Sequence, residues 1–90
     1  MSDSNPQAQK IRVERVQTGV RIEKRMLKVL KALAEYLDLS LGDLLEGIVL
    51  HALEGKPSPL KESILERVEI LKQVYDMEYD SSAAHNFEEI

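Results

Sequence analysis

Residues 16–30 read VQTGVRIEKRMLKVL, and the spacing of apolar residues changes within this stretch. From Val16 to Ile22 large and β-branched residues alternate with polar residues or glycine, which is typical of a strand with one buried face. After Glu23 the apolar residues follow the period of an amphipathic helix that ends near Asp38. These helical positions are Met26, Leu30, Leu33 and Leu37. The stretch therefore predicts one strand followed directly by a helix.

Two further helices are predicted downstream. The run from Ser40 to Asp43 resembles a capping box, so a second helix should begin at Leu41 and run to about Glu54. Gly55 and the proline two positions later would stop it. Eight of its fourteen residues are apolar, so this helix should be covered on more than one side. Ser58 and the following proline predict the start of a third helix, which reaches about Asp76.

The length and composition predict one small domain. The chain has 90 residues, 43% of them hydrophobic, and no Cys. We expect a flexible N-terminal arm at 1–14, a folded core at 15–55, a C-terminal helix at 56–77 and an acidic tail at 78–90. No apolar run is long enough to span a membrane and residues 1–9 lack the apolar core of a secretory signal, so a soluble, cytoplasmic protein is expected.

Charge is distributed unevenly along the chain. Residues 1–31 contain eight basic and three acidic residues, whereas residues 32–90 contain four basic and thirteen acidic ones. A charged ligand responds to the local field within about 10 Å rather than to the net charge of -4. The basic first third of this acidic protein can therefore bind a polyanion.

The sequence offers little for enzyme chemistry. Without Cys there are no disulfides, thiolate zinc sites or thiol nucleophiles, and the two His residues lie far apart in the chain. His51 lies beside the apolar stripe of the second predicted helix, which favours a packed or interface histidine over a ligand. We expect no catalytic residues, no cofactor and no metal, and therefore a protein that is not an enzyme.

A single strand predicts self-association, because its backbone donors and acceptors need a neighbouring strand and the sequence offers no second one. A second copy could supply it by antiparallel pairing, and the apolar second helix would provide the surface buried between the two copies. Because side chains alternate between the two faces of a strand, Val16, Val20 and Ile22 would all point at the core. Val20→Asp should then abolish folding or dimerisation, because it would bury an unpaired charge.

The order of strand, helix, short turn and helix between Gln17 and Leu53 resembles the ribbon-helix-helix family of DNA-binding dimers. Three stretches carry the resemblance: VRIEKRM at 20–26, AEYLDLS at 34–40 and LLEGIVLHAL at 44–53. They are similar to the family's strand-to-helix junction, to the end of its first helix with the turn, and to its apolar second helix. The resemblance implies a mostly α, intertwined homodimer with a two-stranded antiparallel ribbon, here with an added third helix.

It also implies a DNA-binding function, with the ribbon inserted into the major groove and the protein associated with the nucleoid when bound. The residues expected to face the bases are Arg15, Gln17, Gly19 and Arg21; those expected to contact phosphates are Lys24, Lys28, Ser40, Leu41 and Gly42. Arg presents a donor fork to guanine, and Gln offers a donor and an acceptor to adenine. Gly19 can only permit close approach of the backbone, and Asp43 would repel a phosphate.

These features predict a homodimeric, sequence-specific DNA-binding protein that regulates transcription, with double-stranded DNA and a second copy as partners. Two alternatives remain open. The polar positions of the strand can be a solvated face, with the protein acting as a protein-interaction adaptor. The dimer can also be an antitoxin whose third helix and acidic tail bind a protein partner. The tail can fold onto such a partner, or it can lie over the basic strand and compete with DNA.

Overall fold

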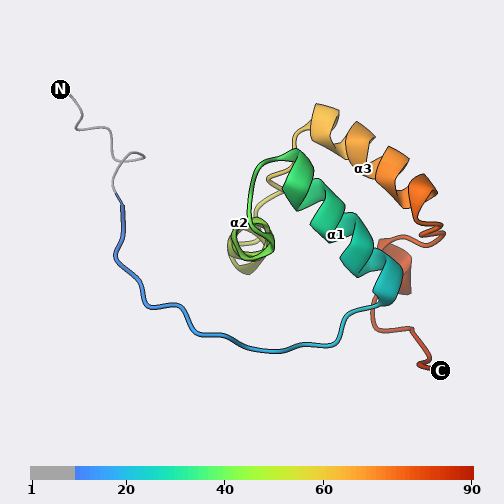
Figure 1. Ribbon diagram of the computed structural model, residues 1–90, viewed down its shortest axis with the longest axis horizontal. Helices are drawn as coiled ribbons and strands as arrows, with labels where there is room; N and C mark the ends of the chain where they lie inside the picture. Colours follow the sequence, from blue (N-terminus) through green and yellow to red (C-terminus); the bar gives the residue numbers. More distant parts are fainter. Residues whose placement is uncertain (1–9) are drawn as a thin grey trace.

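The computed structural model describes residues 10–90, which contain three α-helices and one turn of 3-10 helix (Figure 1). The helices are α1 (Lys24–Tyr36), α2 (Leu41–Leu53) and α3 (Glu62–Val74), and the 3-10 turn is η2 (Ser81–Ala83). The expectation of a mostly α protein therefore agrees with the structure. None of these helices is long and apolar enough to cross a membrane. The arm expected at 1–14 lies largely outside the described residues.

The expected strand is not present, and the ribbon-helix-helix fold predicted from the sequence is wrong. No residue between 10 and 90 is in a β-strand, and residues 10–22 make no backbone hydrogen bond to another residue of that range. The segment is extended, but no second extended segment of the chain lies beside it to form a sheet. Val16 and Val20, expected to point at the core, are 80% and 74% exposed. Alternating polarity thus marks an extended segment here and not a paired strand.

The starts of α1 and α2 are set by local side chains. The Glu23 carboxylate accepts the backbone N–H groups of Arg25 and Met26 and so caps α1. The predicted cap of α2 is confirmed, because Ser40 Oγ accepts the N–H of Asp43 at 3.1 Å. The third helix begins at Glu62, later than the sequence predicts, because Ser58 Oγ accepts the N–H of Leu60 in a separate turn before the helix.

All three helices end in the same way. The second residue after each helix has a positive φ: 57° at Asp38, 68° at Gly55 and 55° at Asp76. The next residue then donates its N–H back into the helix, as Leu39 does to the carbonyl of Ala34 at 2.9 Å. This Schellman arrangement satisfies the last carbonyl groups and turns the chain sharply away from the helix axis.

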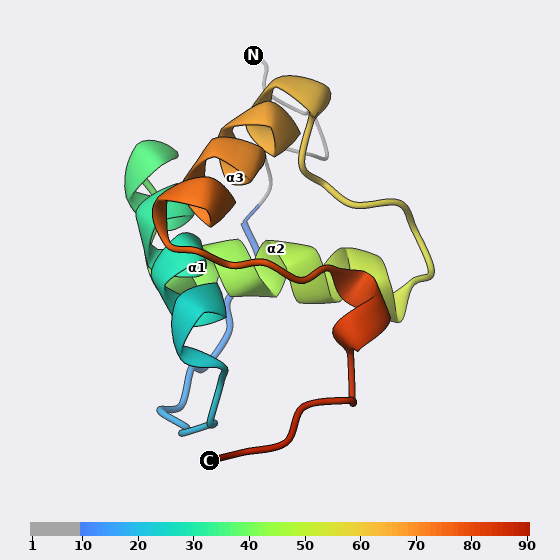
Figure 2. The ribbon, with the colours of Figure 1, turned by 90° about the vertical axis from the view of Figure 1, so that its right-hand side faces the viewer.

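The core lies where α1 meets both other helices. Leu33, Ala34 and Leu44 are its buried centre. Around them pack half-buried residues of all three helices and of the turn before α3: Leu30, Leu37, Ile48, Leu60, Ile64, Val68 and Leu71. Figures 1 and 2 show α3 beside α1 and running in the opposite direction, while α2 crosses them steeply. The helix that carries the most basic residues is therefore also the central one.

The C-terminal segment, residues 75–90, leaves α3 and passes through η2. Figure 2 shows the chain running away from the end of α3 and then turning back, so that the C-terminus lies near the start of α1. Tyr79 and Phe87 pack edge to face, with ring centroids 5.0 Å apart. The segment thus has its own aromatic contact and returns to the N-terminal end of α1.

Candidate nucleic-acid interface

A run of exposed positive charge leads into the first helix. Residues 10–22 are called the basic segment. In Figure 1, where α2 is viewed along its axis, this segment runs past α2 to the start of α1. All eight basic residues from Lys10 to Lys31 are exposed. The residues are Lys10, Arg12, Arg15, Arg21, Lys24, Arg25, Lys28 and Lys31. The positive charge expected from the sequence is therefore on the surface, along one continuous stretch of chain.

Arg15 fastens the basic segment to α2. Its Nε and Nη2 atoms donate to the two carboxylate oxygens of Glu46 at 3.0 and 2.8 Å, and Nη2 lies 3.6 Å from Asp43. The hydrogen bonds from Arg15 lower the pKa of Glu46 below its ordinary value. Both partners lie on the first two turns of α2, so Arg15 is brought close to the predicted phosphate site there. Asp43, expected to repel a phosphate, here helps to hold a guanidinium.

The remaining predicted base-contacting residues lie further along the segment. Gln17 and Gly19 are exposed, and the space around Gly19 is open. Arg21 is 84% exposed along its side chain and forms an ion pair with Glu89. The predicted residues are therefore divided between two places, with Arg15 against α2 and Arg21 at the start of α1.

The predicted phosphate contacts are divided in the same way. Ser40, Leu41 and Gly42 form the cap and first turn of α2, where Leu41 is half-buried and the other two are exposed. The N–H groups of a first helical turn have no partner within the helix and favour an anion. Lys24 and Lys28 lie exposed on the first turns of α1. Together with Arg21 and Arg25 they form a cationic surface that we call the basic junction.

Sequence reasoning missed the polar cluster at the start of α1. The Tyr79 hydroxyl donates to Glu23, and the Arg25 guanidinium lies 5.4 Å from the centre of the Tyr79 ring. Arg25 Nη1 also donates to the backbone carbonyl of Asp76 at 3.2 Å. The only signal in the sequence is the presence of Tyr79 and Phe87 within an otherwise acidic and polar tail.

This cluster perturbs two pKa values. Partial burial of Glu23 favours its neutral form, but hydrogen bonds from Tyr79, Arg25 and Met26 outweigh it and lower its pKa to about 2. Burial and the neighbouring Glu23 carboxylate raise the pKa of Tyr79 to about 12. Tyr79 therefore stays protonated and donates the hydrogen bond, and Glu23 stays ionised and accepts it, throughout the physiological pH range.

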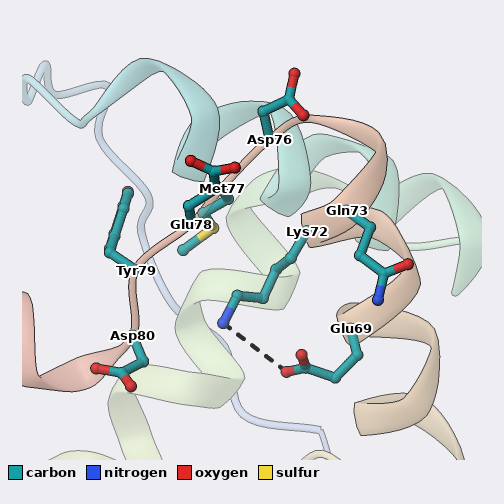
Figure 3. Close-up of a pocket in the computed structure, with 8 residues that line it drawn as sticks. All are labelled: Glu69, Lys72, Gln73, Asp76, Met77, Glu78, Tyr79 and Asp80. Carbon is teal, nitrogen blue, oxygen red and sulfur yellow. Dashed lines mark ion pairs between the residues drawn. The ribbon is translucent and has the colours of Figure 1, made fainter.

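Two hollows adjoin the C-terminal segment. The larger, about 1250 Å³, lies between residues 20–28 and the two ends of the C-terminal segment. The smaller, about 450 Å³, lies at the end of α3, where Figure 3 shows Lys72 paired with Glu69 at 3.8 Å. Four carboxylates line the smaller hollow: Glu69, Asp76, Glu78 and Asp80. No three His, Asp or Glu residues between 10 and 90 are placed to hold a metal ion.

Comparison of the chain with protein-family models, with curated proteins and with solved structures gives no match.

Proposed function

We propose that this protein is a homodimeric, sequence-specific DNA-binding protein and a regulator of transcription. The observation that carries the proposal is the exposure of all eight basic residues between Lys10 and Lys31 on one extended segment and the helix that follows it. An extended chain is narrow enough to lie in a groove of DNA, and its alternate side chains can reach base edges or phosphates. The helices behind it would hold the segment in position.

The chemistry of the basic segment supports base reading as well as phosphate contact. Arg21 can present two donors to a guanine, and Gln17 can pair with an adenine. Arg15 donates through Nε and Nη2 to Glu46, so it would have to leave that carboxylate to contact a base. Gly19 lets the backbone come close to the groove floor, because nothing projects from it. Lys24 and Lys28 would follow the flanking phosphates, and Ser40 with the N–H groups of Leu41 and Gly42 would hold a further phosphate.

The exposed end of α2 supports association with a second copy. Leu50 and Leu53 are 62% and 78% exposed, and Val49 beside them is also exposed. Only four hydrophobic residues are buried in the described part of the chain, which is a small core. A second copy packed on this end of α2 would cover the apolar surface and enlarge the core, as small obligate dimers do.

The test of DNA binding is a selection from random and genomic DNA fragments near 100 mM salt, followed by affinity measurements on the enriched site. Arg21→Ala should weaken binding to that site by about 1 to 3 kcal/mol, the scale of one bidentate contact to a base. Lys28→Ala should weaken binding to all sequences alike, and should reduce the slope of log K against log salt by about 1.

Lys61→Ala is the matched control, because Lys61 is an exposed cation at the start of α3, outside the basic segment. It should bind the selected site as the wild type does. Retention of DNA without enrichment of any site would indicate binding by phosphate contacts alone. Absence of retention would contradict the proposal and would favour the protein-interaction adaptor.

A further inference from the structure

The acidic C-terminal segment contacts the basic junction. Residues 75–90 contain five carboxylate side chains and no Lys or Arg. Three of the four cations of the basic junction contact this segment: Arg21 pairs with Glu89, Arg25 donates to the Asp76 carbonyl, and Lys28 lies 6.0 Å from the centre of the Tyr75 ring. A carboxylate of the segment thus lies at Arg21, where the proposed function requires DNA.

The contacts differ in strength along the segment. The Arg21 and Glu89 side chains are well exposed, and such an ion pair contributes little because water and salt screen it. Tyr79 is half-buried, donates to Glu23, contacts Arg25 and packs against Phe87. The aromatic pair therefore anchors the segment, and its terminal carboxylates can be displaced at little cost.

We propose that the C-terminal segment is an internal competitor of DNA for the basic junction, an inference that rests on the proposed function. Glu89 lies at Nη2 of Arg21, one of the atoms that a bidentate contact to a guanine or a phosphate uses, so Arg21 cannot make that contact while it holds Glu89. Because the segment belongs to the same chain, its effective concentration at the junction is high, on the order of millimolar for a short connection. DNA must displace it, which lowers the apparent affinity and favours sites that engage Arg21 strongly.

The test compares DNA affinities of full-length variants on the selected site at 100 mM salt. The double variant Glu88→Gln and Glu89→Gln should bind about 2- to 5-fold more tightly than the wild type, the effect of removing a competing contact of up to about 1 kcal/mol. Phe87→Ala changes no charge but removes the aromatic anchor, and it should raise the affinity in the same direction. Circular dichroism should show that both variants keep their helices.

The matched control is the double variant Glu62→Gln and Glu66→Gln, which removes the same charge from α3. The affinity of this variant for the selected DNA site should exceed that of the wild type by less than twofold. A second readout follows the contact itself: the proton–proton NOE between the Arg21 and Glu89 side chains should be lost when DNA is added, whereas the NOE between the Tyr79 and Phe87 rings should persist.

The outcomes separate the two proposals. If the wild type binds a specific site and the C-terminal variants bind it equally well, or if the α3 control gains as much, the competitor is overturned and DNA binding stands. If neither the wild type nor any variant binds DNA, both proposals fail together. A gain confined to the Glu88/Glu89 and Phe87 variants supports the competitor.

Discussion

The Glu23 carboxylate joins the beginning of α1 to the C-terminal segment. It accepts the backbone N–H groups of Arg25 and Met26, each at 3.1 Å, the Arg25 Nε at 3.1 Å and the hydroxyl of Tyr79. The two bonds from backbone N–H groups cap the helix, the third joins neighbouring side chains, and the last comes from a residue 56 positions away. One side chain thus combines a local and a long-range role.

Glu23 should make stability depend on pH in the acid range. Its pKa falls from an ordinary value of 4.5 to about 2 in the folded protein, so its contribution is full above about pH 4.5 and is lost as the pH falls towards 2. Glu23→Gln should therefore reduce the free energy of unfolding at pH 6 by on the order of 1 to 3 kcal/mol, and by much less near pH 2. Urea titrations followed by circular dichroism across this range measure the difference.

Tyr79→Phe serves as the matched variant, because it keeps the ring and deletes only the donor to Glu23. Tyr79→Phe should reproduce part of the decrease in the free energy of unfolding that Glu23→Gln causes at pH 6. The raised pKa of Tyr79 has the opposite sign: its contribution is present below pH 10 and is lost as the pH rises towards 12. A difference between wild type and Glu23→Gln that stays constant from pH 6 to pH 2 would contradict this account.

At the level of elements, the basic segment behaves differently from the helices. Val20 is 74% exposed, whereas the sequence places it in the core. Val20→Asp should therefore change the free energy of unfolding by less than about 0.5 kcal/mol, as exposed substitutions usually do. Thermal unfolding followed by circular dichroism tests this. Leu33→Asp is the control, because Leu33 is 2% exposed in the core and a charge there should unfold the chain. Loss of helix in Val20→Asp would show that Val20 is buried after all.

The helices were predictable because their signals are local. The apolar period of α1, the Ser40 cap and Gly55 lie within a few residues of the structure they determine, so α2 begins at the predicted residue and ends within one position of the expected end. The start of α3 was missed by three positions, because Ser58 caps a turn and not the helix.

Local signals could predict neither that residues 16–22 remain unpaired nor which residues contact one another in the candidate site. Alternation at Val16, Thr18 and Val20 says that a segment is extended, but not whether another strand pairs with it. The pairing of Arg15 with Glu46 and of Tyr79 with Glu23 joins residues 31 and 56 positions apart. Contacts of this kind depend on how the helices pack, and no spacing in the sequence encodes them.

At the scale of the whole molecule, we expect the apolar end of α2 to set the oligomeric state. Leu53→Lys should convert a dimer to a monomer, because it places a charge in the proposed contact between copies. Analytical ultracentrifugation over a range of concentrations measures this. Ile70→Lys is the matched control on α3, where the side chain is also exposed, and it should leave the dimer intact. A dimer that survives Leu53→Lys and dissociates with Ile70→Lys would move the interface to α3.

The extended basic segment has a further consequence, for proteolysis. Proteases such as trypsin bind their substrates as extended, accessible chain and cut after Lys or Arg, and helices that keep their hydrogen bonds resist them. Residues 10–22 offer that conformation with Lys10, Arg12, Arg15 and Arg21 in it. A single cut after Arg21 would separate nearly all of the segment from an intact group of helices, so this protein would lose its cationic arm long before it lost its fold.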